Sequence, residues 1–307
     1  MKISIIGAGN VGSTAALRLL EAQTGDIVLV DIAKGQAFGK AMDLDDARRI
    51  LKQDYRIEGT DDFSRINDSD IVVVTAGFPR KPGMTREELL NKNAQIVKEV
   101  ALKIKEHSFG AIVIIVTNPL DLMTYLAKEV TGIMPGKVLG MGISLDASRF
   151  ANLISQELGV ACSDIEAQVI GSHGEGMLPL VRFCKVKGAP LSKLLDDERI
   201  ALLAKRTVER GKEIVAALGS GSAYFAPSAA IADLVKAIAK DEKRTIGVCT
   251  YLNGQYGIKD VCIGLPCVIG KGGIEKIIEL ELDTQEKESL LKSAGALRAL
   301  IDQLEVK

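Results

Sequence analysis

Residues 3–20, ISIIGAGNVGSTAALRLL, join a short apolar run, a glycine-rich turn and an apolar pattern of helical period. The run ISII at 3–6 ends in glycine, which predicts a buried strand. Residues 10–22 carry an apolar side chain every three or four positions, which predicts a helix. A strand that leads through GAGNVG (7–12) into a helix is typical of the first unit of an alternating strand–helix fold.

The alternation continues through the first half of the chain. Further buried strands are predicted at 27–30, 70–77, 111–118 and 137–143. Helical patterns lie between them, such as 86–106, where Thr85 and Glu88 form a predicted capping box. Buried strands that alternate with helices predict an α/β fold: a doubly wound, mainly parallel (Rossmann) sheet with helices on both faces.

After residue 143 the pattern changes to that of an α+β unit. The elements predicted there are helices at 145–158, 195–218, 227–240 and 284–304, and strands at 165–170, 180–186, 246–251 and 259–269. We therefore predict a Rossmann domain over 1–143 and an α+β domain over 144–307, which share a cleft. One large domain is the alternative.

Composition excludes several classes of protein. The 307 residues carry 39 basic and 40 acidic side chains, a formal charge of −1, which favours neither a nucleic-acid nor a membrane partner. The longest apolar runs are too short to span a bilayer, and MKISIIGAG, which is predicted to enter a strand at once, is expected to hold no signal peptide. The five cysteines form no CxxC pair and are expected as buried thiols of a cytoplasmic protein, with no metal site.

The glycine-rich turn predicts a dinucleotide site. Gly7 allows a tight turn, Gly9 lets the backbone approach a pyrophosphate, and Gly12 lets helix and strand pack closely. An acid follows at Asp31, where its carboxylate would accept hydrogen bonds from the ribose hydroxyls and repel a 2′-phosphate, favouring NAD over NADP. A sheet that binds no nucleotide is the alternative. The cofactor residues predicted from this part are Gly7, Ala8, Gly9, Asn10, Val11, Gly12 and Asp31.

Charged residues on an apolar stripe predict a catalytic centre. In GISLDASRF, Asp146 and Arg149 fall on the buried stripe of the 145–158 helix, and buried charges need partners. His173 in GSHGEG follows a predicted strand, is flanked by glycines, and is the candidate partner of Asp146. A histidine can take a proton and return it near neutral pH. The other histidine, His107, is expected at the solvent-exposed end of a helix.

Five motifs in order along nearly the whole chain resemble the lactate/malate dehydrogenase family. They are GAGNVG, RKPGMTR (80–86), TNPLD (117–121), LDASRF (145–150) and GSHGEG (171–176). The resemblance implies that His173 is the proton acceptor with Asp146 as its partner, and that Arg149 and Arg86 bind substrate. It also implies that Asn118 contacts substrate and cofactor, and that Asn93, Val116 and Thr117 line the nicotinamide half of an NAD site. Glu175 departs from the family, which more often has aspartate after the histidine–glycine pair.

The loop FPRKPGMTR (78–86) resembles that of the malate enzymes, because lactate enzymes typically have glutamine at the place of Arg80. If the loop closes over the substrate, Arg86 would polarise the reacting carbonyl and Arg80 would neutralise a second carboxylate. Malate and oxaloacetate have that carboxylate, whereas lactate and pyruvate do not. The resemblance thus implies a malate dehydrogenase of the tricarboxylic acid cycle, as a homodimer or homotetramer. The alternatives are a lactate or other 2-hydroxy-acid dehydrogenase, a sensor that only binds NAD, and a solvated basic loop.

Overall fold

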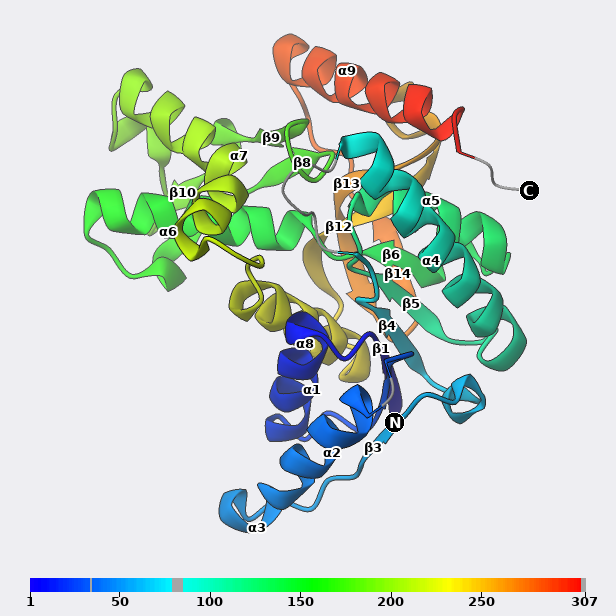
Figure 1. Ribbon diagram of the computed structural model, residues 1–307. Helices are drawn as coiled ribbons and strands as arrows, with labels where there is room; N and C mark the ends of the chain where they lie inside the picture. The colour runs from blue at the N-terminus through cyan, green and yellow to red at the C-terminus, as the bar shows by residue number, and fades with distance from the viewer. Residues whose placement is uncertain (34, 79–84, 305–307) are drawn as a thin grey trace.

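One large sheet runs through both halves of the chain (Figure 1). The computed structural model describes residues 1–33, 35–78 and 85–304. The first part of the sheet is parallel, in the order β3-β2-β1-β4-β5-β6. Its strands are β1 (Lys2–Ile6), β2 (Asp26–Val30), β3 (Ile57–Thr60), β4 (Ile71–Val74), β5 (Ile112–Ile115) and β6 (Val138–Gly140). Every residue of β4 and β5 is buried, as expected for parallel strands that are covered on both faces.

Helices cover both faces of the parallel strands (Figure 1). The helices are α1 (Asn10–Glu21), α2 (Gln36–Asp46), α3 (Arg48–Leu51), α4 (Arg86–His107), α5 (Leu120–Thr131), α6 (Ile143–Leu158), α7 (Asp197–Leu218), α8 (Phe225–Ala239) and α9 (Thr284–Ile301). On one face, Leu19 of α1 and Leu234 of α8 share a core with Ile5. On the other face, α4, α5 and α9 bury their apolar sides against the sheet. The packing of α8 on α1 means that a helix from the second half completes the core of the first.

The second half extends the sheet with antiparallel strands. These are β8 (Val169–Gly171), β9 (Met177–Pro179), β12 (Arg244–Asn253), β13 (Lys259–Gly270) and β14 (Gly273–Ile277). The join is the pairing of β12 with β6, at Cys249 and Gly140. A small separate sheet holds β7 (Ile165–Glu166), β10 (Lys185–Val186) and β11 (Ala189–Pro190). Helices α6 and α7 form a third core with these segments.

The predicted α/β fold with a C-terminal α+β part is confirmed, but several bounds were wrong. Strands β4, β5 and β6 each end three residues before the predicted end, at Val74, Ile115 and Gly140. Within the strand predicted at 180–186, Val181–Phe183 form a 3-10 turn and only Lys185–Val186 form a strand. The capping box before α4 is confirmed, since Thr85 Oγ1 accepts from the N–H of Glu88 at 3.1 Å and the carboxylate of Glu88 accepts from the N–H of Thr85 at 2.9 Å.

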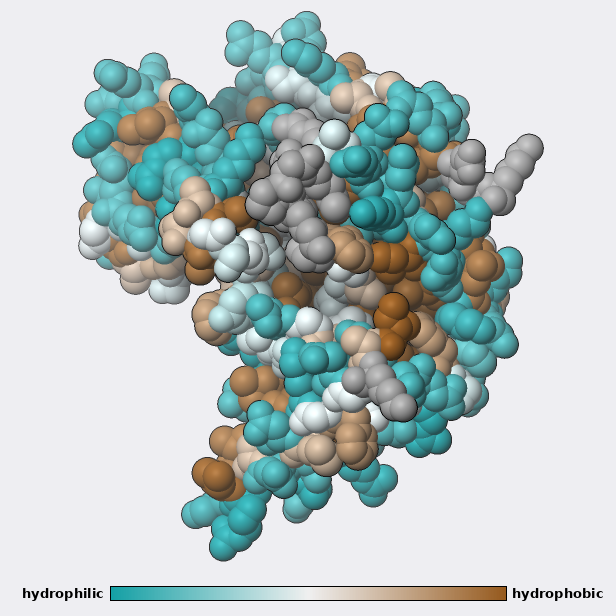
Figure 2. Space-filling view, viewed as in Figure 1, coloured by the Kyte–Doolittle hydropathy of each residue, from teal (hydrophilic) through white to brown (hydrophobic). Residues whose placement is uncertain are grey.

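Polar residues cover most of the face shown in Figure 2, and apolar residues are visible at its lower end, over α2 and α3. The prediction that the cysteines are buried was wrong for Cys162, which is exposed in the turn after α6, while the other four are buried and all five are free. No helix within residues 1–33, 35–78 and 85–304 is long and apolar enough to cross a membrane.

The carboxyl ends of the parallel strands meet at one edge of the sheet. There β1 leads into the glycine-rich turn, β2 into Asp31, β5 into Val116 and β6 into α6. Strands β1 and β4 are neighbours, although the chain leaves them toward opposite sides of the sheet. Ligands of doubly wound sheets bind outside such a switch point. The candidate site is therefore at this edge.

Candidate active site

The glycine-rich turn is built so that α1 begins directly against β1. Gly7 has a φ of +106°, which favours glycine, and a Cβ atom there would lie 2.6 Å from the backbone nitrogen of Ala76. A Cβ atom on Gly12 would lie 1.9 Å from the carbonyl oxygen of Gly7. At Gly9, in contrast, a Cβ atom would meet no described protein atom within 4 Å. The turn therefore packs tightly on its inner side and leaves the backbone of Gly9 open to a ligand.

The start of α1 suits an anionic ligand. Gly9 is the N-cap residue and has no side chain to cap the first N–H groups of the helix, those of Asn10 and Val11 among them. No acidic residue lies in the first turn. The positive end of the helix dipole thus faces the same open side of the turn as Gly9.

Asp31 ties the glycine-rich turn to the end of β2. Its Oδ2 accepts a hydrogen bond from the backbone N–H of Ala8 at 2.7 Å, and its Oδ1 accepts one from Ala33 at 2.8 Å. Each carboxylate oxygen keeps a lone pair, so Asp31 can still accept hydrogen bonds from a ligand hydroxyl. The carboxylate is thereby fixed beside the turn rather than free in solvent.

The catalytic residues predicted from sequence meet at Asp146, in the first turn of α6. This side chain is fully buried, its Oδ2 lies 2.6 Å from Nδ1 of His173, and its Oδ1 lies 3.1 Å from a terminal nitrogen of Arg149. The exposed fractions of the His173 and Arg149 side chains are only 17% and 13%. One buried carboxylate therefore orients both an imidazole and a guanidinium.

The charges around His173 raise the pKa of its imidazole. Burial lowers this pKa, but the charge and the hydrogen bond of Asp146 and the charge of Asp121 act more strongly in the opposite direction, against a smaller lowering by Arg149. Because an ionised carboxylate can only accept hydrogen bonds, the nitrogen that faces it, Nδ1 of His173, is the donor and carries a proton. Nε2 is then the ring nitrogen that can accept a proton from a ligand.

The loop that carries His173 is held by contacts that the sequence did not predict. The backbone N–H of His173 donates to Oδ2 of Asp121, in the first turn of α5, at 2.9 Å. Gly142, just before α6, faces the histidine so closely that a Cβ atom there would lie 3.1 Å from Cγ of the imidazole. Ser293 of α9 accepts from the N–H of Ser172 at 3.1 Å and donates to the carbonyl oxygen of Gly176 at 3.0 Å.

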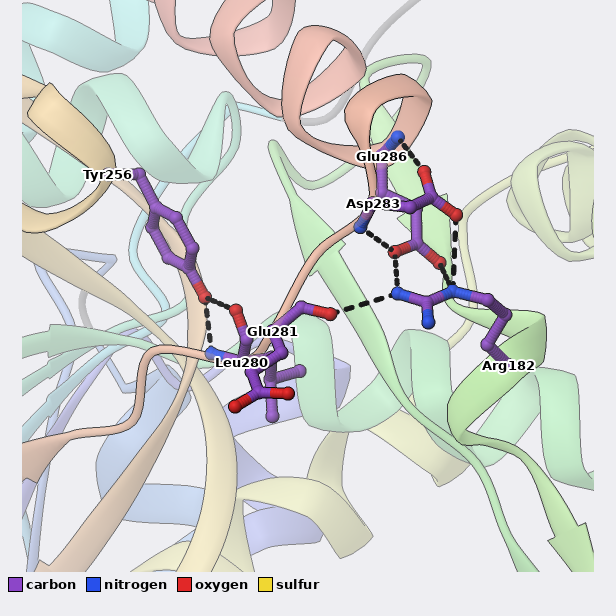
Figure 3. Close-up of polar contacts among 6 residues, drawn as sticks. All are labelled: Arg182, Tyr256, Leu280, Glu281, Asp283 and Glu286. Atoms are coloured by element: carbon purple, nitrogen blue, oxygen red, sulfur yellow. Dashed lines mark hydrogen bonds and ion pairs between the residues drawn. The ribbon is translucent and has the colours of Figure 1, made fainter.

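The start of α9 is itself fixed, which places Ser293. Figure 3 shows Arg182, which follows β9, reaching both oxygens of Glu286 at 3.1 and 2.6 Å and the carbonyl oxygen of Glu281 at 2.9 Å. Asp283 and Glu286 also form the capping box of α9. Tyr256 holds the preceding segment, donating to the carbonyl oxygen of Leu280 at 3.1 Å. These contacts anchor the helix that supports the histidine loop.

The residues predicted on the nicotinamide side lie around the loop after β5. Asn93 of α4 is buried; its amide donates to the carbonyl oxygen of Asn118 at 2.7 Å and accepts from the N–H of Phe78 at 2.6 Å. Thr117 donates to the carbonyl oxygen of Ala76 at 2.6 Å. Val116 is half-buried and Asn118 is exposed. Asn93 thus connects two loops by its side chain, while Asn118 presents its own side chain outward.

The two arginines of the 78–86 loop are not both described. Arg80 lies outside the described residues. Arg86 is the first residue of α4, and its side chain is also outside what is described. Glu175, the departure from the family pattern, is exposed and pairs with Lys212 of α7 at 3.0 Å. Of the predicted site, the structure therefore brings together His173, Asp146 and Arg149 at one place, and the glycine-rich turn with Asp31 at another.

Three residues of the site were missed from the sequence: Asp121, Gly142 and Ser293. Asp121 had a visible signal, since it is an acid at the start of the apolar stretch LDLM, in which every residue is buried. Gly142 and Ser293 gave none, because their partners are distant in sequence. Within the described ranges, no group of three or more histidine, cysteine or acidic side chains could hold a metal ion.

Comparisons with known proteins agree with this geometry. The model of the lactate/malate dehydrogenase NAD binding domain matches residues 1–140, and that of the family's alpha/beta C-terminal domain matches residues 143–307. The malate dehydrogenase of Methanosarcina barkeri is 48% identical over 305 residues, which are 99% of this chain and 99% of that protein.

Solved structures show the same fold over the whole chain. The crystal structure of Cryptosporidium parvum malate dehydrogenase has a TM-score of 0.97 at 40% identity and covers 100% of this chain and 99% of its own. The lactate dehydrogenase of that organism, complexed with lactic acid and β-nicotinamide adenine dinucleotide, has a TM-score of 0.95 at 37% identity and covers 99% of this chain and 98% of its own. With both halves matched, this chain belongs to the lactate/malate dehydrogenase family.

Proposed function

We propose that the chain catalyses the reversible, NAD-dependent oxidation of (S)-malate to oxaloacetate. The observation that carries the proposal is the buried carboxylate of Asp146, which orients the imidazole of His173 and the guanidinium of Arg149 together. An acid–base group and a carboxylate-binding group held side by side are what a 2-hydroxy acid requires. The name of the Methanosarcina relative, 48% identical over the whole chain, supports malate as the acid.

His173 would move the proton of the reaction. Malate oxidation removes a hydride from C2 and a proton from the hydroxyl on that carbon; bound NAD supplies the hydride acceptor. Because Nδ1 of His173 is bonded to Asp146, Nε2 is left to take the hydroxyl proton and to return it in the reverse direction. The carboxylate of Asp146 stabilises the imidazolium that forms, by the same logic as in hydrolytic triads.

Arg149 would hold the substrate in place for this transfer. A guanidinium can bind a carboxylate with two parallel hydrogen bonds, which fixes the neighbouring C2 atom at attack distance. One terminal nitrogen of Arg149 is used by Asp146, whereas Nε is buried without a hydrogen-bond partner among the described residues. A buried donor without a partner is costly, and a bound ligand carboxylate would supply one.

The glycine-rich turn and the residues after β5 fit NAD. We propose that the pyrophosphate lies at the start of α1, beside Gly9, and that Asp31 accepts hydrogen bonds from the ribose hydroxyls. Gly7, Ala8, Asn10, Val11 and Gly12 complete that part of the proposed site. Asn93, Val116, Thr117 and Asn118 would line the nicotinamide side.

Asp31→Asn tests the cofactor preference. The amide can still accept from Ala8, but it no longer repels a 2′-phosphate, so we expect the ratio of kcat/KM for NADH over NADPH to fall about ten- to hundred-fold. Initial rates with both cofactors measure the ratio. Asp26→Asn, at the exposed opposite end of β2, is the matched control and should leave the ratio unchanged. An unaltered ratio in the Asp31 variant would remove the residue from cofactor selection.

A dicarboxylate as substrate is the finer part of the proposal. Arg86 would polarise the reacting carbonyl, and Arg80 would pair with the remote carboxylate of malate, which lactate lacks. The decay of NADH absorbance with oxaloacetate, pyruvate and 2-oxoglutarate in parallel tests this directly. Preference for oxaloacetate supports the proposal. Preference for pyruvate would indicate a lactate dehydrogenase, and the absence of turnover with all three would indicate a protein that only binds NAD.

We also propose a division of roles, an assembly and a location. Residues 1–143 carry all the proposed NAD contacts together with Arg80, Arg86 and Asn118 of the proposed substrate site, and residues 144–307 carry His173, Asp146 and Arg149. The proposed homodimer or homotetramer is supported by exposed apolar side chains on α2 and α3, including Phe38, Met42 and Ile50. Five free cysteines support a cytoplasmic protein, where the reaction would belong to the tricarboxylic acid cycle.

A further inference from the structure

Asp121 is a buried acid that is not among the residues proposed to bind the substrate or the cofactor or to transfer the proton. Only 3% of the residue is exposed, in the first turn of α5. Its Oδ2 accepts the backbone N–H of His173, and its Oδ1 has no hydrogen-bond partner among the described residues. Removing an ionisable group from water in this way is costly, so a carboxylate at this place needs a reason.

The surroundings of Asp121 connect it to the catalytic histidine rather than to solvent. The groups that face its carboxylate are the thiol of Cys249 on β12, His173, and Asp146 on α6; Cys262 on β13 lies next to Cys249. Those that face the imidazole are Asp146, Asp121 and Arg149. The histidine is therefore held twice, by its ring from Asp146 and by its main chain from Asp121.

We propose that Asp121 is a positioning residue for His173, whose buried carboxylate anchors the main chain of the histidine and adds a second negative charge beside the imidazole. The inference deepens the proposed function and rests on it, since it gives Asp121 a part in the proton transfer by His173. A fixed main chain keeps Nε2 in line with the substrate hydroxyl. A second negative charge favours the imidazolium that forms when malate is oxidised.

The acid–base properties of Asp121 agree with this role. Burial raises the pKa of its carboxyl to about 6, although the thiol of Cys249 and the charge and backbone N–H of His173 lower it. An acid whose pKa is raised on folding makes the folded state less stable as pH rises from about 4 to about 6, and this cost remains at higher pH. The ionised carboxylate of Asp121 therefore lowers the free energy of unfolding at neutral pH.

Three variants separate the charge from the anchor. Asp121→Asn keeps an oxygen that can accept from His173 but removes the charge. Asp121→Ala removes both. Ser293→Ala removes another anchor of the same loop, the one at Ser172 and Gly176, and leaves every charge in place. Each is compared with the unaltered chain by oxaloacetate reduction with NADH, by thermal unfolding at pH 4.5 and 8, and by NMR titration of the histidines.

The titration is simple to assign because the chain has two histidines, and His107→Gln identifies the signal of His173. In Asp121→Asn we expect His173 to titrate at lower pH than in the unaltered chain, with a Tm at pH 8 that is equal or higher. In Asp121→Ala we expect the same lowering of the pH at which His173 titrates, together with a fall in kcat of about ten- to hundred-fold. The fall in kcat should be smaller in Asp121→Asn, which keeps an acceptor for the N–H of His173. Ser293→Ala should lower Tm without moving the titration.

Two results would overturn the proposal: a His173 titration that does not move in Asp121→Asn, or an unchanged kcat in Asp121→Ala. Failure of the proposed function looks different, because the unaltered chain would then prefer pyruvate to oxaloacetate or reduce none of the oxo acids. The NMR titration and the Tm do not depend on turnover, so they test the role of Asp121 in that case too.

Discussion

Replacement of His173 by asparagine is expected to lower the turnover of oxaloacetate reduction by about 10²–10⁴-fold, with the affinity for NADH retained. The side chain of asparagine can occupy the same place beside Asp146, but it cannot donate and recover a proton near neutral pH. The residues proposed to hold the cofactor are all unchanged in this variant; they lie on the turn after β1, at the end of β2, on α4 and on the loop after β5. The variant should therefore lose turnover while it keeps its affinity for NADH.

Stopped-flow or steady-state rates give kcat, and the change in NADH fluorescence on binding gives the affinity. His107→Asn is the matched control, because it removes the other histidine, which ends α4 and contacts Asn67. That control should keep the kinetics of the unaltered chain. Near-normal turnover in the His173 variant would remove this residue from the mechanism.

Replacement of Arg80 by glutamine is expected to move the preference from oxaloacetate toward pyruvate. If Arg80 pairs with the remote carboxylate of oxaloacetate, enclosing it over the methyl group of pyruvate leaves a desolvated charge unpaired, at a cost of about 3–5 kcal/mol. That corresponds to roughly a hundred-fold to several-thousand-fold discrimination between the two substrates. Glutamine is uncharged and removes this cost, so kcat/KM should rise for pyruvate and the ratio of oxaloacetate over pyruvate should fall.

The measurement is the ratio of kcat/KM for oxaloacetate over pyruvate. Lys81→Gln removes the neighbouring positive charge and is the matched control, for which we expect an unchanged ratio. If Arg80→Gln also leaves the ratio as it was, specificity is determined elsewhere, and the reading of the 78–86 loop is wrong.

Much of the site geometry could be predicted because its signals are local. Asp146 and Arg149 are charged residues on an otherwise apolar helical stripe, so burial required a partner, and His173 between two glycines was the available one. The glycine-rich turn follows from steric requirements within a few residues, at Gly7 and Gly12. The meeting of His173, Asp146 and Arg149 was therefore predicted, and the structure has it.

What could not be predicted depends on contacts between distant parts of the chain. Asp121 and His173 are 52 residues apart, and Ser172 and Ser293 are 121 apart, so no spacing within one element indicates either pair. Strand β3 was also missed, because its residues are only half-buried at the edge of the sheet and include a glycine. The continuation of the sheet into the second half was also missed. The strands β6 and β12 that join the two halves are far apart in sequence and pair only at Gly140 and Cys249.

The shared sheet limits how this protein could be recombined with others. A chimaera that replaced residues 1–143 by another dinucleotide-binding unit would have to supply a last parallel strand that pairs with β12, and a first helix whose surface accepts Leu234 and its neighbours on α8. Loops at the carboxyl edge, in contrast, can be exchanged without disturbing either contact. Changes of substrate are therefore easier to reach by altering loops than by exchanging halves.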